Sequence, residues 1–179
     1  MKVIILGPPG AGKGTQAELI SQKYKLKNIS AGKVLRSEIK RRTEIGRKVE
    51  PYVERGDLAP DNLVYLAVKK RLEGNFVLDG YPRHMNQLKR IDIQIDCIVF
   101  LDCKKNTVFE RLFKRRVLEK RKDDDLKTID HRWKVYKRRT LPVIKYYRNK
   151  KMLIHVDGDP DVMDVFKDIC KKLDKHCRK

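Results

Sequence analysis

Short, uninterrupted apolar runs alternate along the chain with longer stretches in which apolar residues recur every three or four positions. The runs predict five strands, at residues 3–6, 28–29, 76–79, 97–101 and 153–156. Runs that are apolar at successive positions are typical of strands that helices cover on both faces. The pattern therefore predicts an α/β fold, with a parallel sheet of about five strands and helices on both of its faces.

Two of the stretches between these strands are predicted helices, over residues 63–72 and 108–117. Pro60 would lie in the first turn of the former, where its missing N–H is tolerated. In the latter, four apolar residues form two pairs that are each spaced by four positions. These pairs are Val108 with Leu112 and Phe109 with Phe113. We expect the face that carries them to pack in the core.

A glycine-rich loop follows the first predicted strand and runs into a predicted helix. Residues 7–15 read GPPGAGKGT. Glycines let a backbone bend around a phosphate so that several N–H groups point inward, and Lys13 adds a full charge for the terminal phosphates. Gly14 separates Lys13 from Thr15, whereas the strict motif has Ser or Thr directly after the lysine. This departure argues against a Mg²⁺ ligand at position 14.

The composition adds the chemistry of the partner. The chain has 179 residues, enough for one domain with its own core, and a net charge of +20. Such an excess says little about the fold, but it indicates an anionic partner, for which phosphate is the obvious candidate. The four cysteines, at 97, 103, 170 and 177, lack the spacing of zinc ligands, so we expect free, mostly buried thiols.

Positive charge is unevenly distributed along the chain. It is dense over residues 114–122 and again in a helical pattern farther on, which contains Arg132, Lys134, Lys137, Arg138 and Arg139. A solvated helix face is the usual explanation of such a run, but like charges repel one another and an anionic ligand would relieve the repulsion.

No apolar run has the length of a membrane span. The run at residues 3–6 is also too short for the apolar region of a signal peptide. We therefore expect a cytoplasmic protein without a membrane partner. Separately, we expect a monomer.

Several motifs occur in order along nearly the whole chain. Besides the glycine loop they are ISAG at 29–32 followed by Leu35 and Arg36, LDGYPR at 78–83, Glu110 with Arg111, Arg115 with Arg116, RKDD at 121–124 with Arg132, and VDG at 156–158. With them the sequence closely resembles the adenylate kinase family of nucleoside monophosphate kinases.

The resemblance implies one P-loop kinase domain over residues 1–179, with two mobile parts. One is a helical arm for the nucleoside monophosphate (NMP), at about 30–59, and the other is a lid at about 115–125. Only six residues separate Arg116 from Asp123, so the lid is expected to be short, without the zinc-bearing module of some relatives. The implied reaction is the reversible, Mg²⁺-dependent transfer of the γ-phosphoryl group of ATP to AMP, which gives two ADP.

On the ATP side, the resemblance places Lys13 on the β- and γ-phosphates and Arg111 against the adenine. Asp79 would hold Mg²⁺ through water. The implied ATP-binding residues are Gly10, Ala11, Gly12, Lys13, Gly14, Thr15, Arg111, Arg115 and Gly158. The implied catalytic residues are Lys13, Arg83, Arg115, Arg121 and Arg132. Asp123 and Asp124 would organise the clamp arginines or cap the following helix.

On the acceptor side, Arg36 and Arg83 would bind the phosphate of the mononucleotide. The implied NMP-binding residues are Ala31, Arg36, Asp57, Leu58, Ala59, Gly80, Tyr81, Pro82, Arg83, Gln87, Arg121 and Arg132. Two of them disagree on the base, because Gln87 is typical of AMP-using members and Ala31 of UMP/CMP kinases. A side-chain amide that pairs with adenine discriminates by roughly 1–3 kcal/mol, which favours AMP. Lys33 also departs from the family, which has an aspartate there.

Two alternatives to an AMP kinase remain at this stage. The first is a UMP/CMP kinase or a kinase with a broad range of acceptors. The second is an RNA-associated P-loop ATPase, whose positive charge would bind an RNA backbone. Nucleic-acid binding is not favoured, because no aromatic-rich RNA-binding module is evident and the basic residues are expected where nucleotide phosphates bind.

Overall fold

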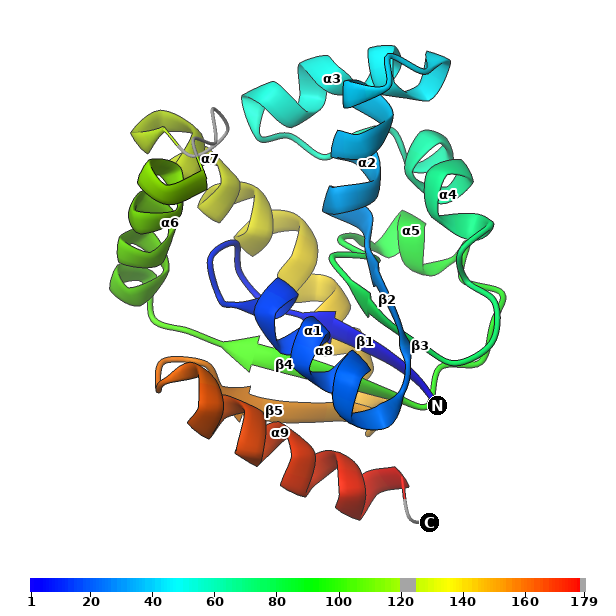
Figure 1. Ribbon diagram of the computed structural model, residues 1–179, viewed down its shortest axis with the longest axis vertical. Coiled ribbons are helices and arrows are strands. Elements are labelled where there is room, and N and C mark those ends of the chain that lie inside the picture. The colour runs from blue at the N-terminus through cyan, green and yellow to red at the C-terminus, as the bar shows by residue number, and fades with distance from the viewer. Residues whose placement is uncertain (120–124, 178–179) are drawn as a thin grey trace.

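A five-stranded parallel sheet forms the centre of the protein (Figure 1). The computed structural model describes residues 1–119 and 125–177, apart from the side chains of Glu119 and Cys177. Its strands are β1 (Lys2–Leu6), β2 (Lys27–Ser30), β3 (Phe76–Asp79), β4 (Cys97–Asp102) and β5 (Leu153–Asp157). Their order across the sheet is β2-β3-β1-β4-β5. The five strands predicted from the apolar runs are thus confirmed to within one or two residues.

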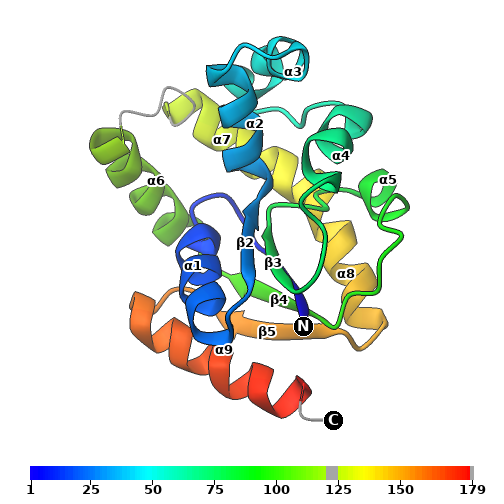
Figure 2. The ribbon, with the colours of Figure 1, turned by 45° about the vertical axis from the view of Figure 1, so that its right-hand side comes forward.

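Helices cover both faces of the sheet. In chain order they are α1 (Lys13–Tyr24), α2 (Ala31–Lys40), α3 (Glu44–Arg55), α4 (Asp61–Lys69), α5 (Met85–Leu88), α6 (Lys105–Glu119), α7 (Leu126–Val135), the π-helical segment η2 (Tyr136–Thr140), α8 (Leu141–Asn149) and α9 (Val162–Cys177). Figures 1 and 2 show α1 and α9 on one face of the sheet and α8 on the other. None of the helices within the described ranges combines the length and apolarity that crossing a bilayer needs.

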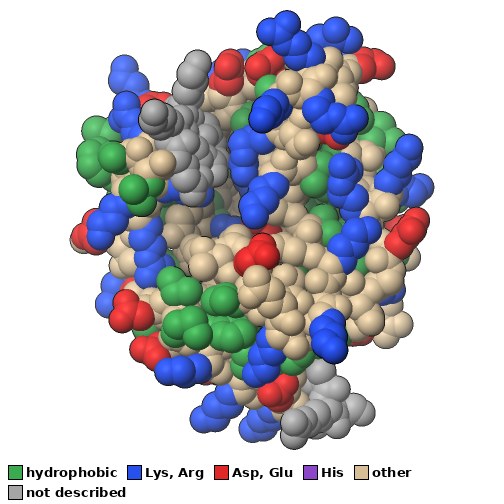
Figure 3. Space-filling model, in the orientation of Figure 1, with side chains coloured by type: hydrophobic (Ala, Val, Ile, Leu, Met, Phe, Trp, Pro, Cys, Tyr) green, Lys and Arg blue, Asp and Glu red, His purple; other side chains and the backbone are tan. Residues whose placement is uncertain are grey.

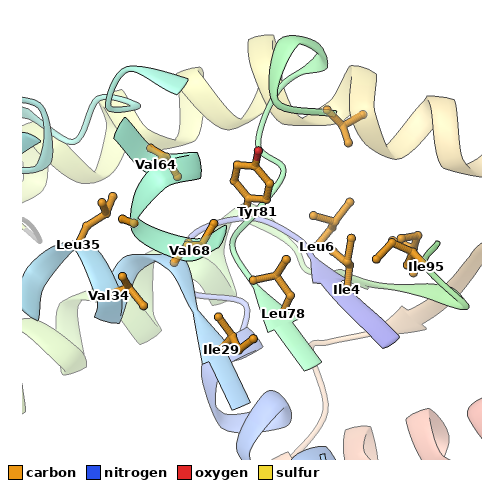
Figure 4. Packing of buried hydrophobic residues seen from close by; sticks show 14 of the residues in the cluster. Ile4, Leu6, Ile29, Val34, Leu35, Val64, Val68, Leu78, Tyr81 and Ile95 are labelled. Carbon is orange, nitrogen blue, oxygen red and sulfur yellow. The ribbon is translucent and has the colours of Figure 1, made fainter. Parts of the chain in front are cut away.

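The apolar residues of the central strands form two clusters, because successive side chains of a strand point to opposite faces. Ile4 and Leu6 of β1 pack on the face with α4 and α8, together with Tyr81 (Figure 4). Val3 and Ile5 pack on the face with α1 and α9. Burial on both faces explains why these strands are apolar at every position.

Two details of the predicted helices are wrong. The helix predicted at 63–72 runs from Asp61 to Lys69, and Pro60 precedes it as its N-cap rather than lying in its first turn. Phe113 of α6 is 52% exposed, although Val108 and Leu112 are completely buried. The two predicted pairs therefore do not share one buried face, because α6 meets the rest of the molecule along a narrow stripe.

The carboxyl ends of all five strands lie at the same edge of the sheet, since the strands are parallel. The chain leaves β1 toward β2 on one side, and β4 lies on the other side of β1. Ligands of open α/β sheets bind outside the carboxyl ends of the strands at such a reversal of strand order. The topology therefore places the glycine loop, which follows β1, at the centre of this edge.

Candidate active site

The glycine loop joins β1 to α1, as its sequence predicts. Gly12 has a φ of 80° and precedes the first residue of α1, Lys13. Gly10 has a φ of 83°, and a side chain there would lie 2.8 Å from the Leu112 side chain and from the Val108 carbonyl oxygen of α6. These positions require glycine because of their positive φ, and at Gly10 also because α6 lies so close.

The Lys13 side chain folds back onto the glycine loop, of which Lys13 is itself part. Its Nζ donates a hydrogen bond of 2.6 Å to the carbonyl oxygen of Pro8. Burial lowers the pKa of its ammonium group to about 8, and the cations of Arg83 and Arg132 among others contribute to the decrease, which the carboxylate of Asp79 opposes. The lysine is therefore a cation that still lacks sufficient negative charge around it.

Asp79 ends β3 beside the glycine loop. Its Oδ2 accepts a hydrogen bond of 3.0 Å from the Ser30 hydroxyl, at the end of the neighbouring strand β2. Its Oδ1 is buried without a hydrogen-bond partner in the structure. A side chain at Gly14 would lie 3.8 Å from Oδ2, so the carboxylate faces the start of α1. An unsatisfied buried oxygen at this place fits a hydrated divalent cation.

These groups open into a cleft of about 730 Å³, which is large enough for nucleotides. Its walls carry the cations Lys13, Arg36, Arg83, Arg115 and Arg132, from five different parts of the chain. Lys and Arg side chains gather along the α2 side of the recess in Figure 3. The tertiary fold thus brings together the arginines that the sequence singled out, in one concentrated positive field.

Arg83 is fixed by its own backbone and by the helix behind it. Its Nε donates to the Gly80 carbonyl oxygen at 2.8 Å, and its backbone N–H donates to Gln87 Oε1 at 2.7 Å. The Thr140 hydroxyl donates to the Arg83 carbonyl oxygen at 2.9 Å. A side chain at Gly80 would lie 2.9 Å from Arg83 Nη2. The guanidinium is therefore preorganised at the cleft.

A side pocket of about 70 Å³ leads from the cleft into the arm. Several small and apolar side chains shape it. Among them are Ala31, Leu35, Val53, Leu58, Ala59 and Val64. Gln87 lines the same pocket and is 2% exposed. Because Arg83 N–H holds Gln87 Oε1, the carboxamide is oriented with its NH₂ group still available to a ligand.

Arg111 of α6 lies against the loop that follows β5. Its Nη1 donates to the Gly158 carbonyl oxygen at 2.7 Å, and its Nη2 donates to the carbonyl oxygens of Asp159 and Pro160 at 2.9 and 3.2 Å. Gly158 is packed against the Cys103 thiol, so a side chain there would clash. The guanidinium and the loop thus form one surface at the α6 end of the cleft.

The arm touches α7 directly. Asp57, just after α3, forms a hydrogen bond of 2.6 Å with His131 Nε2 on α7. This hydrogen bond is the main cause that lowers the pKa of Asp57. A side chain at Gly56 would lie 2.7 Å from Arg132 Cγ and from Thr128 Cγ2. The arm and α7 therefore meet at the place where Arg132 enters the cleft.

Most of the predicted site residues line the cleft or its side pocket, and two groups do not. Tyr81 is completely buried and belongs to the core, and neither it nor Pro82 lines the cavities described above. Arg121, Asp123 and Asp124 lie outside the described residues. The cap of α7 is Asp125, whose side chain accepts from the backbone N–H of Thr128.

Two polar residues of the site were missed by the sequence analysis. Ser30 bonds Asp79, and Thr140 bonds the backbone of Arg83. Ser30 belongs to the ISAG motif at residues 29–32, so the sequence did contain a signal for its position. No sequence signal indicated Thr140. The turn that directs it inward is π-helical, and such turns have no clear sequence pattern.

Comparison with known proteins decides the family. The model of the adenylate kinase family matches residues 5–152. The chain belongs to the adenylate kinase family. Proteins named adenylate kinase from Clostridium acetobutylicum and Archaeoglobus fulgidus are 38% and 36% identical, over 94% and 98% of this chain and 97% and 99% of their own lengths. One from Azobacteroides pseudotrichonymphae is 39% identical over 97% of both chains.

Membership agrees with the fold and with the kinase chemistry expected from the motifs. The parallel sheet with its glycine loop is the P-loop architecture of this adenylate kinase family, as the sequence predicts. The relatives are matched over nearly their full lengths, so the comparison covers whole enzymes.

Proposed function

We propose that this chain is an adenylate kinase, which transfers the γ-phosphoryl group of ATP reversibly to AMP and forms two ADP. The single observation that carries the proposal is the cleft, where Lys13, Arg36, Arg83, Arg115 and Arg132 converge around the carboxyl edge of the sheet. Phosphoryl transfer needs positioning and positive charge, and no covalent nucleophile. The cleft supplies both.

ATP binds with its phosphates on the loop of residues 7–15 and its base near Arg111. The backbone N–H groups at the start of α1 and the Lys13 ammonium meet the phosphates. Arg111 and the loop from Gly158 to Pro160 are already joined by three hydrogen bonds. The flat guanidinium can therefore stack on adenine without reorganising.

AMP binds in the arm, with its base in the side pocket and its phosphate on Arg36 and Arg83. Gln87 supports adenine as the base, because its NH₂ group is a donor for adenine N1 and its Oε1 retains a lone pair for the 6-amino group. Ala31 lines the same pocket and supplies no hydroxyl.

Mg²⁺ is the cofactor, and Asp79 is the residue that holds it, through water. The residues fit this ion because Asp79 Oδ1 is buried without a partner and Gly14 supplies no competing hydroxyl. When bound, the ion neutralises charge on the phosphates. No zinc is part of the proposal.

Transfer takes place between two phosphates that are held end to end. Lys13 stabilises the charge that develops toward the leaving ADP, and Arg83 with Arg36 fixes the attacking AMP phosphate. Arg132 and Arg115 stabilise the transferring group, together with Arg121. Planar guanidinium groups match the equatorial oxygens of that group and stay charged at any working pH.

Two parts exclude water from this reaction when they close, the arm at about 30–59 and a short lid at about 115–125, of which residues 120–124 lie outside the described residues. Closure prevents hydrolysis of ATP. The lengths of the alignments agree with a chain that is shorter than some of its relatives. The alignment with the Clostridium relative extends over 208 residues, more than the 179 of this chain, whereas that with the Azobacteroides relative extends over 186. This chain therefore lacks segments that the first relative has.

The decisive experiment measures formation of ADP from ATP with AMP, CMP and UMP as separate acceptors. We expect AMP to have the largest kcat/KM. A larger kcat/KM with CMP or UMP would instead support the acceptor preference that Ala31 suggests. If none of the three acceptors yields a diphosphate, the kinase reaction itself is refuted.

A matched variant tests the role of Gln87. Gln87→Glu keeps an oxygen for the Arg83 N–H and removes the NH₂ donor, so kcat/KM for AMP should fall roughly 10- to 100-fold, as expected for loss of a base contact of about 1–3 kcal/mol. The KM for ATP should stay unchanged. An unaltered kcat/KM for AMP would show that Gln87 does not read the base.

A further inference from the structure

The helix that forms the back wall of the cleft presents a continuous basic surface on its other side. Tyr136 and Thr140 of η2 line the cleft. The next residues along the same helix, Val143, Ile144 and Tyr147, are buried against the core. The exposed cations of η2 and α8 form what we call the outer basic face. They are Lys137, Arg138, Arg139, Lys145 and Arg148.

This face contradicts one expectation from the sequence. The basic residues were expected where nucleotide phosphates bind, but among those of η2 none lines the cleft or its side pocket. The helix directs them to solvent, because its inward stripe is occupied by apolar residues and Thr140. Arg138 and Lys145, seven residues apart, lie opposite the buried stripe, about 10 Å from each other along the axis.

The outer basic face has no negative charge of its own. Between His131 and Val156 the sequence contains nine Lys and Arg residues and neither Asp nor Glu. Within residues 1–119 and 125–177, no ion pair is formed by any cation of this face.

Other helices of the same chain balance their lysines. On α9, Lys167 pairs with Asp164 at 3.1 Å and Lys172 pairs with Asp168 at 2.6 Å. On α3, Lys48 pairs with Glu44. The net charge is therefore not spread evenly over the surface. The cations of the outer basic face repel one another along one helix, and an external anion would compensate them.

The position of the face allows a partner to bind without blocking the cleft. Figure 1 shows α8 behind the sheet, and Figure 2 shows it at the side away from α1 and α9. Because one helix separates the cleft from the face, nucleotides and the partner can be bound together.

We propose that the outer basic face binds the phosphate backbone of single-stranded RNA. A row of cations along a helix matches a chain of phosphates. Tyr146, 37% exposed, offers a ring on the same helix on which a base can stack, with Lys150 beside it. The only other large apolar side chain exposed on α8 within the described chain is Leu141, at 36%. This is too little apolar surface to insert into a membrane.

The experiment measures binding of a labelled RNA of about 20 nucleotides to the full chain by fluorescence anisotropy, in the presence of saturating ADP and Mg²⁺. If five phosphates are neutralised, affinity should fall roughly 100-fold between about 50 and about 200 mM KCl. RNA that binds without ADP and is released at saturating ADP would lie in the cleft, and this result would overturn the proposal.

Two variants of equal charge separate this face from the net charge of the molecule. Arg138→Glu with Lys145→Glu should weaken RNA binding at least about tenfold at low salt. The control, Lys171→Glu with Lys175→Glu, makes the same change on exposed positions of α9, across the sheet, and should weaken binding less than about threefold. Both variants should keep their kinase activity, which verifies folding.

Three further results would overturn the proposal. The first is an equal loss of RNA binding in both variants, which would assign binding to net charge alone. The second is binding of poly-glutamate as tight as that of RNA, which would remove the role of the nucleic acid. The third is binding to phosphatidylserine vesicles that depends on Arg138 and Lys145 while RNA does not bind, which would make the face a membrane contact.

Discussion

At the scale of single residues, the site depends on cations that have been brought together before any phosphate is present. Lys13 shows most clearly that these cations destabilise one another, since burial and neighbouring arginines lower the pKa of its ammonium group to about 8. A phosphate that binds beside it supplies the missing negative charge and raises that pKa again. Nucleotide binding is therefore coupled to the uptake of a proton at alkaline pH.

Lys13 should make ATP capture depend on pH. Free enzyme loses the Lys13 charge as pH rises through its pKa of about 8. We expect kcat/KM for ATP to fall up to roughly 30-fold from about pH 7 to about pH 9.5, because each pH unit above the pKa removes at most a factor of ten. The value of kcat at saturating ATP should change little.

The control for this profile is Lys13→Arg, whose charge does not titrate in the range. Its kcat will be lower because the guanidinium is larger, but its kcat/KM for ATP should be flat with pH. A wild-type-like decrease in this variant would assign the titration to another group.

Arg83 is needed for its shape as well as its charge. Its backbone and Nε are held by Gln87 and Gly80, so the fork of donors is aimed into the cleft. Arg83→Lys keeps the charge and loses the fork, and kcat should fall at least about 100-fold, as when a preorganised donor to a transition state is lost. Steady-state assays of ADP formation measure this, and near-normal turnover would show that Arg83 has another role.

At the scale of elements, the decisive contact is the one between the arm and α7. The pair of Asp57 and His131 is partly exposed, 35% and 45% at the two side chains. Gly56 lies directly beside it, with no room for a side chain against Arg132 and Thr128. The pair therefore holds the arm near the helix that carries Arg132, and favours the arrangement that receives AMP.

Removal of His131 should weaken AMP binding selectively. His131→Ala is expected to raise the KM for AMP roughly two- to fivefold, since an exposed pair contributes up to about 1 kcal/mol. The KM for ATP should not change. Lys134→Ala is the matched control, because Lys134 pairs with Asp130 on the same helix and does not touch the arm. Equal effects of the two variants on the KM for AMP would contradict a specific role of the pair.

At the scale of the whole molecule, the net charge of +20 is a source of self-repulsion. The ion pairs of α9 and α3 are largely exposed and contribute little. Screening of these charges by salt should therefore raise the free energy of unfolding, because it weakens the repulsion more than the attraction.

We expect KCl to stabilise the protein. The Tm should rise by about 3–5 °C between about 20 and about 300 mM KCl, measured by differential scanning calorimetry. Choline chloride should act equally, whereas sulfate and phosphate are unsuitable because the cations of the cleft are expected to bind them. A Tm that falls with KCl would show that attraction between charges outweighs repulsion.

The sequence by itself determined the strands, the glycine loop and the resemblance that named the family. The reason is local, because strands covered on both faces must be apolar at each position, and a phosphate loop must place glycine where φ is positive. The identities of Arg36, Arg83 and Arg132 as candidates also came from motifs of neighbouring residues.

Only the tertiary structure decided what each charge faces. Arg132 of α7 enters the cleft, whereas Arg138, in the π-helical segment that continues α7, points to solvent. Thr140, at the end of the same segment, donates a hydrogen bond to the Arg83 carbonyl oxygen. The contact of Asp57 with His131 joins residues 74 positions apart. Such placements depend on how helices pack on the sheet, and no periodicity along the chain records that packing.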